Sequence, residues 1–261
     1  ALKYMDLTTS NKPKLYSLLL FLFLATFNLE AKGIFNFSEL TSRYASWAIN
    51  PTNGRSSIYL KEAWRSFGKK KKDVIVAVVD TGIDPDHPYF KNNLKVLNGN
   101  SSRKNYGLDF SAGAINKLQP YDFHGHGTHI AGIIRSVYPH VKLLILKYYN
   151  PNASGQDNLD ATIEALRFAV KSNVDIINYS GGGPEPSSEE REILKEAEKK
   201  EILVVAAAGN ESSNIDKKQN AFFPASYQFK NIITVTANDQ ALNILPSSNY
   251  GKSSVHLSAP G

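Results

Sequence analysis

The chain has 261 residues, of which 42% are hydrophobic and 21% are charged. This excludes a disordered tail, a collagen-like fibre and a polytopic membrane protein, and it leaves enough chain for one sizeable core. The 30 basic against 24 acidic residues give a net charge of +6, and there is no cysteine, which excludes disulfides, thiol nucleophiles and zinc–thiolate sites. The four lysines at 69–72 have no aromatic residues between them, so we interpret them as a solvated turn rather than a nucleic-acid patch.

The N-terminal segment has the pattern of a secretory signal peptide. After Met5 come two basic residues, an apolar run at 15–27 and a small residue suited to cleavage at the end of 29–31. The run is shorter than the roughly 20 residues of a spanning helix, and a buried helix or an uncleaved anchor are the alternatives. We therefore expect a signal peptide within 1–31, with a few residues upstream of Met5, and a secreted, periplasmic or cell-envelope protein. Residues 32–59 read as a linker or N-terminal arm.

From residue 60 onward, predicted strands alternate with predicted helices. The strands are short runs rich in β-branched residues, typical of strands buried on both faces. Such alternation requires crossover connections, so we expect an α/β fold of three layers with a mainly parallel central sheet. Functional residues should then lie in the turns that follow the strands. The expected strands are 74–79, 141–146, 174–179, 202–208 and 232–237; the expected helices are 158–172 and one that starts at a capping box formed by Ser187 and Glu190.

Two of these turns carry ionisable side chains. Asp80 ends the first strand, where it is either a positioned acid or a residue that caps a turn. Three of the six histidines, His124, His126 and His129, lie close together further on. Their spacing fits a metal site, but it also fits a general base that is oriented by Asp80. Both interpretations stay open from the residues alone.

Two later turns are rich in glycine. Residues 180–183 leave the backbone bare, which suits the close approach of another chain or simply a loop. Asn210 follows the strand expected at 202–208, where its amide is either a donor in the crevice or part of a turn.

The motifs VVDTGID, HGHGTHIAG, INYSGGGP and VVAAAGNE, in this order, resemble those of the subtilisin-like serine proteases, or subtilases. The resemblance covers residues 60–261 and implies a partial catalytic domain of a secreted serine endopeptidase. It implies that Asp80 is the triad aspartate, that His126 is the general base and that Asn210 is the side-chain donor of the oxyanion hole. It further implies that the substrate is held by Ser180, Gly181 and Gly182 on one wall, and by Ala207, Ala208 and Gly209 on the other.

The nucleophile of this family has no match among the serines of the chain. In subtilases it lies in a Gly-Thr-Ser motif beyond an Ala-Pro-Gly, and here Ala259-Pro260-Gly261 ends the sequence. We therefore expect a C-terminally truncated fragment without peptidase activity. The alternatives are a non-catalytic, subtilase-like peptide-binding protein and a histidine-based metallohydrolase.

No cofactor or metal is expected. The resemblance would allow calcium, but the loop of the family's strong calcium site is missing, and Tyr89 stands where that site has an aspartate. The expected partner is a polypeptide substrate. We expect a monomer that binds no nucleic acid and does not stay inserted in a membrane after signal removal.

Substrate specificity depends on Phe222. The pair Phe223-Pro224 matches an aromatic–proline pair beside the pocket for the P1 side chain, the residue N-terminal to the cleaved bond, and this peptide bond is commonly cis in the family. The preceding residue is often glycine in relatives with a deep pocket. The Phe222 ring therefore either fills the pocket and favours small P1 side chains, or packs outward against the neighbouring helix.

Overall fold

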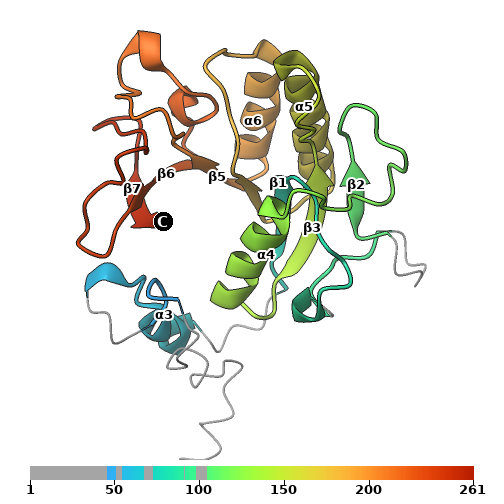
Figure 1. The fold of residues 1–261 in the computed structure, drawn as a ribbon, viewed down its shortest axis with the longest axis horizontal. Coiled ribbons are helices and arrows are strands. Elements are labelled where there is room, and N and C mark those ends of the chain that lie inside the picture. Colours follow the sequence, from blue (N-terminus) through green and yellow to red (C-terminus); the bar gives the residue numbers. More distant parts are fainter. Residues whose placement is uncertain (1–45, 51–54, 68–72, 91, 98–104) are drawn as a thin grey trace, which may run out of the picture.

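The computed structural model describes residues 46–50, 55–67, 73–90, 92–97 and 105–261 (Figure 1). The expected signal peptide and the lysines at 69–72 lie outside the described residues. Of the expected linker, only 46–50 and 55–59 are described.

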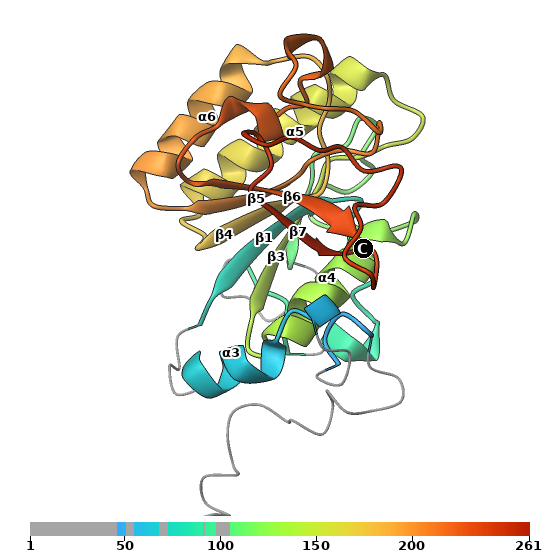
Figure 2. The ribbon, with the colours of Figure 1, turned by 90° about the vertical axis from the view of Figure 1, so that its left-hand side faces the viewer.

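A seven-stranded sheet forms the centre of the molecule, in the order β2-β3-β1-β4-β5-β6-β7 (Figures 1 and 2). Every neighbouring pair of strands is parallel. This confirms the predicted α/β fold with a mainly parallel sheet. The strands are β1 (Ile75–Asp80), β2 (Gly107–Asp109), β3 (Lys142–Lys147), β4 (Ile176–Tyr179), β5 (Leu203–Ala207), β6 (Ile232–Asn238) and β7 (Leu257–Pro260).

The two edge strands were not predicted. β2 has only three residues, too few to show a hydrophobic period. β7, with the sequence Leu-Ser-Ala-Pro, is short and contains a proline, so it shows no strand pattern, but it pairs with β6 along its whole length. A proline is compatible with a strand at the edge of a sheet, where one row of backbone groups has no partner strand.

Helices cover both faces of the sheet, as Figure 2 shows most clearly. α5 (Gly155–Lys171) and α6 (Ser188–Lys199) lie over one face, and α4 (His126–Val137) lies over the other. Alternate strand residues point to opposite faces, so two cores form. Leu144, Leu146, Ile177 and Val204 face Leu166, Ala169, Leu194 and Ala197, whereas Val76, Val78, Leu143 and Ile145 face Ala131.

A further helix, α3 (Leu60–Phe67), packs on α4. Leu60 and Trp64 are buried against Val137 and Tyr138, and the Trp64 indole donates a hydrogen bond of 2.7 Å to the Val137 carbonyl. The part of the chain just before the first strand is therefore anchored to the domain.

The two helix N-termini on the α5–α6 face differ. Ser154 and Asp157 form a full capping box at α5. At α6, Ser187 accepts from the backbone N–H of Glu190 at 3.3 Å, but the return bond is missing, because the Tyr227 hydroxyl takes the Ser187 N–H instead. The predicted capping box at α6 is therefore only half formed. The Glu190 side chain is buried instead of reaching back to the Ser187 N–H.

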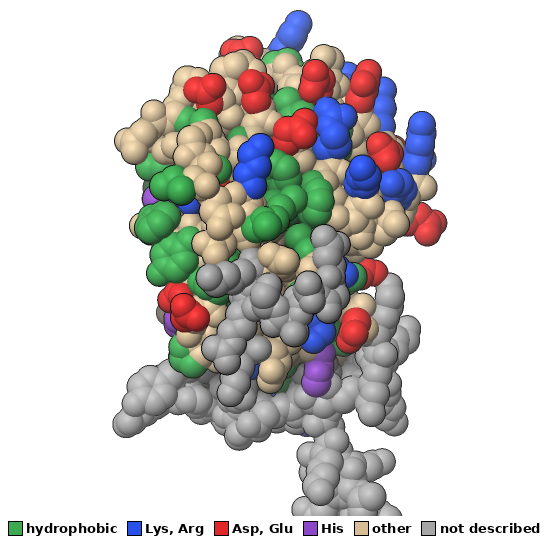
Figure 3. Space-filling view, turned by 90° about the vertical axis from the view of Figure 1, so that its right-hand side faces the viewer, with side chains coloured by type: hydrophobic (Ala, Val, Ile, Leu, Met, Phe, Trp, Pro, Cys, Tyr) green, Lys and Arg blue, Asp and Glu red, His purple; other side chains and the backbone are tan. Residues whose placement is uncertain are grey.

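The described surface carries mixed charges. On the face in Figure 3, acidic and basic side chains lie side by side rather than in patches of one sign. In the described part of the chain, no helix combines the length and hydropathy required to span a bilayer.

Tyr89 stands at the position matched to the aspartate of the family's calcium site. Its ring stacks under the Arg135 guanidinium, which lies 3.8 Å from the ring centroid.

Candidate active site

Asp80 and His126 meet where β1 ends and α4 begins. Asp80 is only 3% exposed, and its Oδ1 lies 2.7 Å from Nδ1 of His126. The same oxygen accepts the Thr81 N–H at 2.7 Å. The His126 side chain is 44% exposed. A buried carboxylate thus holds one nitrogen of an accessible imidazole and leaves Nε2 available to a reacting group.

Glycines allow this close approach. Gly125, before the helix, has a left-handed backbone with φ of 93°. A side-chain carbon at Gly127 would collide with the Gly82 carbonyl and would lie 3.2 Å from Oδ1 of Asp80. Only glycine at 127 lets the first turn of α4 lie directly on the turn after β1.

A second carboxylate, Asp122, ties this corner together. Its Oδ1 accepts from the Thr81 hydroxyl and from the N–H groups of His124 and Gly125, at 2.8–2.9 Å. Its Oδ2 accepts from the N–H and the hydroxyl of Thr128, at 2.9 and 2.7 Å. Burial tends to raise the pKa of Asp122, but these hydrogen bonds outweigh it and lower the pKa to about 2. Sequence patterns assign no role to Asp122, because no spacing rule connects it with Thr81 across 41 residues.

Of the three clustered histidines, only His126 contacts Asp80. The His124 ring lies edge-on to the rings of His126 and Tyr149, with centroids 6.2 and 6.0 Å away. Within the described ranges, no group of three or more histidine, aspartate or glutamate side chains is placed to hold a metal ion. The geometry therefore favours the imidazole–carboxylate pair over the metal site.

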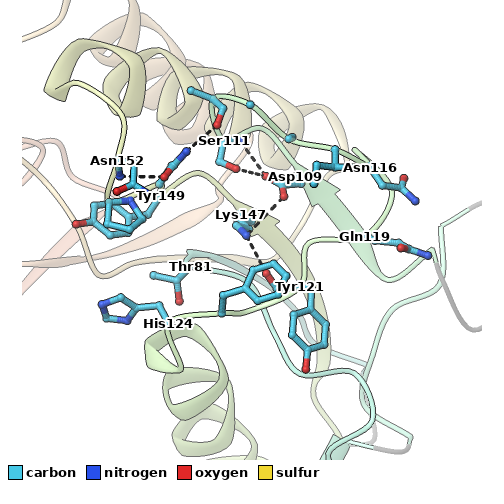
Figure 4. A pocket seen from close by; sticks show the side chains of 17 residues that line it. Thr81, Asp109, Ser111, Asn116, Gln119, Tyr121, His124, Lys147, Tyr149 and Asn152 are labelled. Atoms are coloured by element: carbon cyan, nitrogen blue, oxygen red, sulfur yellow. Dashed lines mark hydrogen bonds and ion pairs between the residues drawn. The ribbon is translucent and has the colours of Figure 1, made fainter.

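Beside this corner lies a pocket of about 450 Å³ (Figure 4). Lys147 lies in its centre, where its ammonium is 3.6 Å from Oδ2 of Asp109 and donates to the Tyr121 carbonyl at 2.8 Å. Thr81 and His124 also line it. The charge of Lys147 is balanced by Asp109, so the pocket wall carries no unpaired cation.

The predicted substrate walls lie at the carboxyl ends of β4 and β5. Ser180, Ala207, Ala208, Gly209 and Asn210 line one cavity of about 270 Å³. Asn210 is exposed, and the turn before it is fixed by Asn249, which donates to the carbonyls of Ala208 and Gly209 at 2.9 Å.

The Phe222 ring lies between these walls. A side-chain carbon at Gly182 would collide with the ring, and one at Gly209 would lie 3.2 Å from it. The ring therefore points inward, the first of the two orientations considered above. The following peptide bond, Phe223–Pro224, is cis as predicted, and Gly183 and Phe223 exchange two backbone hydrogen bonds, at 2.7 and 3.0 Å.

Comparison with protein families matches residues 71–261 to the subtilase family, Peptidase S8. The chain belongs to this family. It is 36% identical over 218 residues to the major intracellular serine protease of Bacillus subtilis (strain 168), covering 80% of this chain and 64% of that protein. It is also 36% identical to the intracellular serine protease of Paenibacillus polymyxa, covering 73% of this chain and 57% of that protein.

Solved subtilase structures resemble the fold. A lanthipeptide protease superposes with a TM-score of 0.60 at 26% identity, over 77% of this chain and 60% of that one. The epidermin leader peptide processing serine protease of Staphylococcus aureus superposes with a TM-score of 0.61 at 22% identity. The match covers 74% of this chain and 53% of that one. The chain thus spans less than two thirds of the length of these subtilases.

The comparisons correct one prediction. A secreted, periplasmic or cell-envelope location was inferred from the apolar N-terminal run, but the two relatives at 36% identity are named intracellular proteases. The predicted location is therefore wrong. An apolar run of 13 residues has the length and composition of a signal peptide whether or not it acts as one, so the pattern could not decide the location.

Proposed function

We propose that this subtilase domain belongs to a serine endopeptidase that hydrolyses polypeptides. The observation that carries the proposal is the 2.7 Å contact between Asp80 and Nδ1 of His126. In this proposal His126 acts as general base through Nε2: it takes the proton of a serine hydroxyl as the oxygen attacks the peptide carbonyl, and it later gives that proton to the leaving amine. Asp80 fixes the tautomer and stabilises the imidazolium.

The substrate side of the proposal uses the carboxyl ends of β4 and β5. The backbone of Ser180, Gly181 and Gly182 pairs with the extended peptide, while Ala207, Ala208 and Gly209 form the opposite wall. The Asn210 amide donates to the oxyanion that develops on the attacked carbonyl. In the described residues, no serine hydroxyl is hydrogen-bonded to His126, so the nucleophile is not assigned.

Cleavage of a fluorogenic peptide library by the complete gene product tests this proposal. In subtilisin, a member of this family, removal of one triad side chain lowers kcat by about 10⁴- to 10⁶-fold, and we expect losses of that order in His126→Ala and Asp80→Asn. The matched control is Asp86→Asn, because Asp86 is an exposed aspartate near the same turn. Unchanged cleavage in His126→Ala would refute the mechanism. Peptide binding without cleavage would favour the non-catalytic alternative, and loss of cleavage in a chelator would favour the metallohydrolase.

A further inference from the structure

Glu190 places a buried carboxyl group in the wall of a pocket that the proposed mechanism does not use. The pocket measures about 490 Å³ and lies between the segment that follows β3 and the segment that follows β4. Glu190 comes from the first turn of α6, and the whole residue is only 2% exposed. Buried glutamates are rare unless a cation or hydrogen bonds compensate the lost hydration.

The hydrogen bonds of Glu190 are few. Its side chain bonds with the Tyr227 hydroxyl, but that hydroxyl also donates to the Ser187 carbonyl at 3.0 Å. Because a phenol has a single proton, it cannot serve both acceptors at once. An ionised Glu190 must therefore compete with the Ser187 carbonyl for the Tyr227 proton.

No basic side chain in the described part of the protein forms an ion pair with Glu190. Its neighbour Arg191 lies over the Phe229 ring at 5.8 Å, and Arg167 pairs with Glu164 and Glu189. Burial accordingly raises the pKa of Glu190 to about 7, and only the Tyr227 hydrogen bond opposes this. A cation entering the pocket would supply the missing partner.

The rest of the pocket also suits a cation on an apolar stem. Tyr148, Tyr149, Tyr179 and Phe223 line it together with Leu159. Tyr148 and Tyr179 meet edge to face at 5.8 Å, and burial raises the pKa of both phenols above its ordinary value, so they stay neutral. Aromatic faces attract ammonium and guanidinium groups, and the apolar walls accommodate the methylene stem of lysine or arginine.

The pocket adjoins the segment proposed to pair with the substrate. Gly182 and Gly183 line it, and Gly181 lies so close to the Tyr148 hydroxyl that a side chain there would collide with it. The Phe222 ring lies elsewhere, against Gly209 and the other face of Gly182, where the P1 side chain is proposed to bind. We propose that this second pocket binds a lysine or arginine side chain of the peptide, at a position other than P1, through an ion pair with Glu190. This inference rests on the proposed function for the path of the peptide.

A positional scan tests it on the complete gene product. Peptides carry one lysine, or the uncharged isostere norleucine, at each position in turn around a small P1 residue. Cleavage is measured as kcat/KM, and binding is measured by fluorescence anisotropy in a His126→Ala background. A charge-assisted hydrogen bond contributes about 1.5–3 kcal/mol, so we expect one position where lysine is preferred about 10- to 100-fold.

The variants Glu190→Gln and Glu189→Gln form a matched pair. Both replace one carboxyl group in the first turn of α6 by an amide, but Glu189 is exposed and does not line the pocket. The lysine preference should fall to near parity in Glu190→Gln and persist in Glu189→Gln. Glutamine reproduces the shape of the neutral acid, so Glu190→Gln should fold, which circular dichroism checks.

The outcomes separate the two proposals. If no position prefers lysine, or if the preference survives in Glu190→Gln, the pocket assignment is overturned even when peptides are cleaved. If lysine peptides bind in a Glu190-dependent way but nothing is cleaved, the pocket assignment stands and the proposed function fails. If no peptide binds at all, both fail.

Discussion

Replacing Asp122 by asparagine should loosen the corner that holds His126. Asparagine can keep Oδ1 and its three donors, which come from Thr81, His124 and Gly125. In place of Oδ2, however, it puts an NH₂ group opposite the N–H and the hydroxyl of Thr128. The Thr128 hydroxyl oxygen already accepts the Asp84 N–H at 3.0 Å, and if it accepted the new NH₂ group as well, its own proton would still lose the Oδ2 acceptor.

The expected cost follows from these two lost bonds. A buried donor left without an acceptor costs about 1–3 kcal/mol, so the loss of two acceptors in Asp122→Asn should lower the free energy of unfolding by about 2–6 kcal/mol at pH 7. The folded pKa of Asp122 is about 2, below the ordinary 3.8, so its ionised form stabilises the fold above pH 3.8. This contribution is lost as the pH falls toward 2, and the difference between wild type and variant should shrink with it.

Urea unfolding between pH 3 and 7 measures this effect. The control is Asp86→Asn, which removes an exposed carboxylate from the same region and should change stability by less than about 0.5 kcal/mol. Because Asp122 also anchors the residues just before His126, the alkaline and acid limbs of the kcat/KM profile should shift in Asp122→Asn. Equal stability of the two variants at pH 7, with unchanged pH profiles, would refute this account of the corner.

Three further outcomes are expected. Glu190→Gln should stabilise the protein by up to about 3 kcal/mol above pH 7 and have little effect at pH 4.5, as measured by urea unfolding. The reason is that the folded pKa of Glu190, about 7, exceeds the ordinary 4.5, so ionisation of the buried acid destabilises the fold. A difference in stability that does not depend on pH would contradict this. Phe222→Gly should raise kcat/KM for P1 phenylalanine relative to P1 alanine, whereas a strong wild-type preference for phenylalanine, unchanged in the variant, would rule out a filled pocket. Gly127→Ala should lower kcat and cost about 1–3 kcal/mol, since the new methyl group meets the Gly82 backbone; wild-type kcat and stability would show that α4 can shift freely.

The parts of the fold that the sequence predicted are those with a strong local pattern. Runs such as 74–79 are apolar and β-branched throughout, so the buried strands were found to within one or two residues at most ends. The strand pattern also places Asp80 at the carboxyl edge of the sheet, but the choice of His126 as its partner among three clustered histidines came from the resemblance to the subtilases.

Contacts between distant residues left no such pattern. Asp122 bonds Thr81 because two turns converge in space, and β7 is a strand because it lies beside β6, although its four residues include a proline and show no strand pattern. The sequence could not decide between the two orientations of the Phe222 ring. The choice depends on Gly182 and Gly209, which are distant in sequence and leave room for the ring because neither has a side chain.

At Glu190 the local capping-box pattern and the tertiary structure disagree, and the residue lines a pocket beside the proposed substrate segment. The pattern of Ser187 followed by Glu190 predicts a solvent-exposed capping box, and at α5 the same kind of pair forms one in full. At α6 the glutamate instead turns into a tyrosine-lined pocket, where burial disfavours its charge. An alanine or leucine there would avoid that cost and still permit the helix. A buried acid that breaks a local rule and has no cationic partner in the described protein is the kind of exception found at functional sites, and here it lies beside the glycines proposed to hold the peptide.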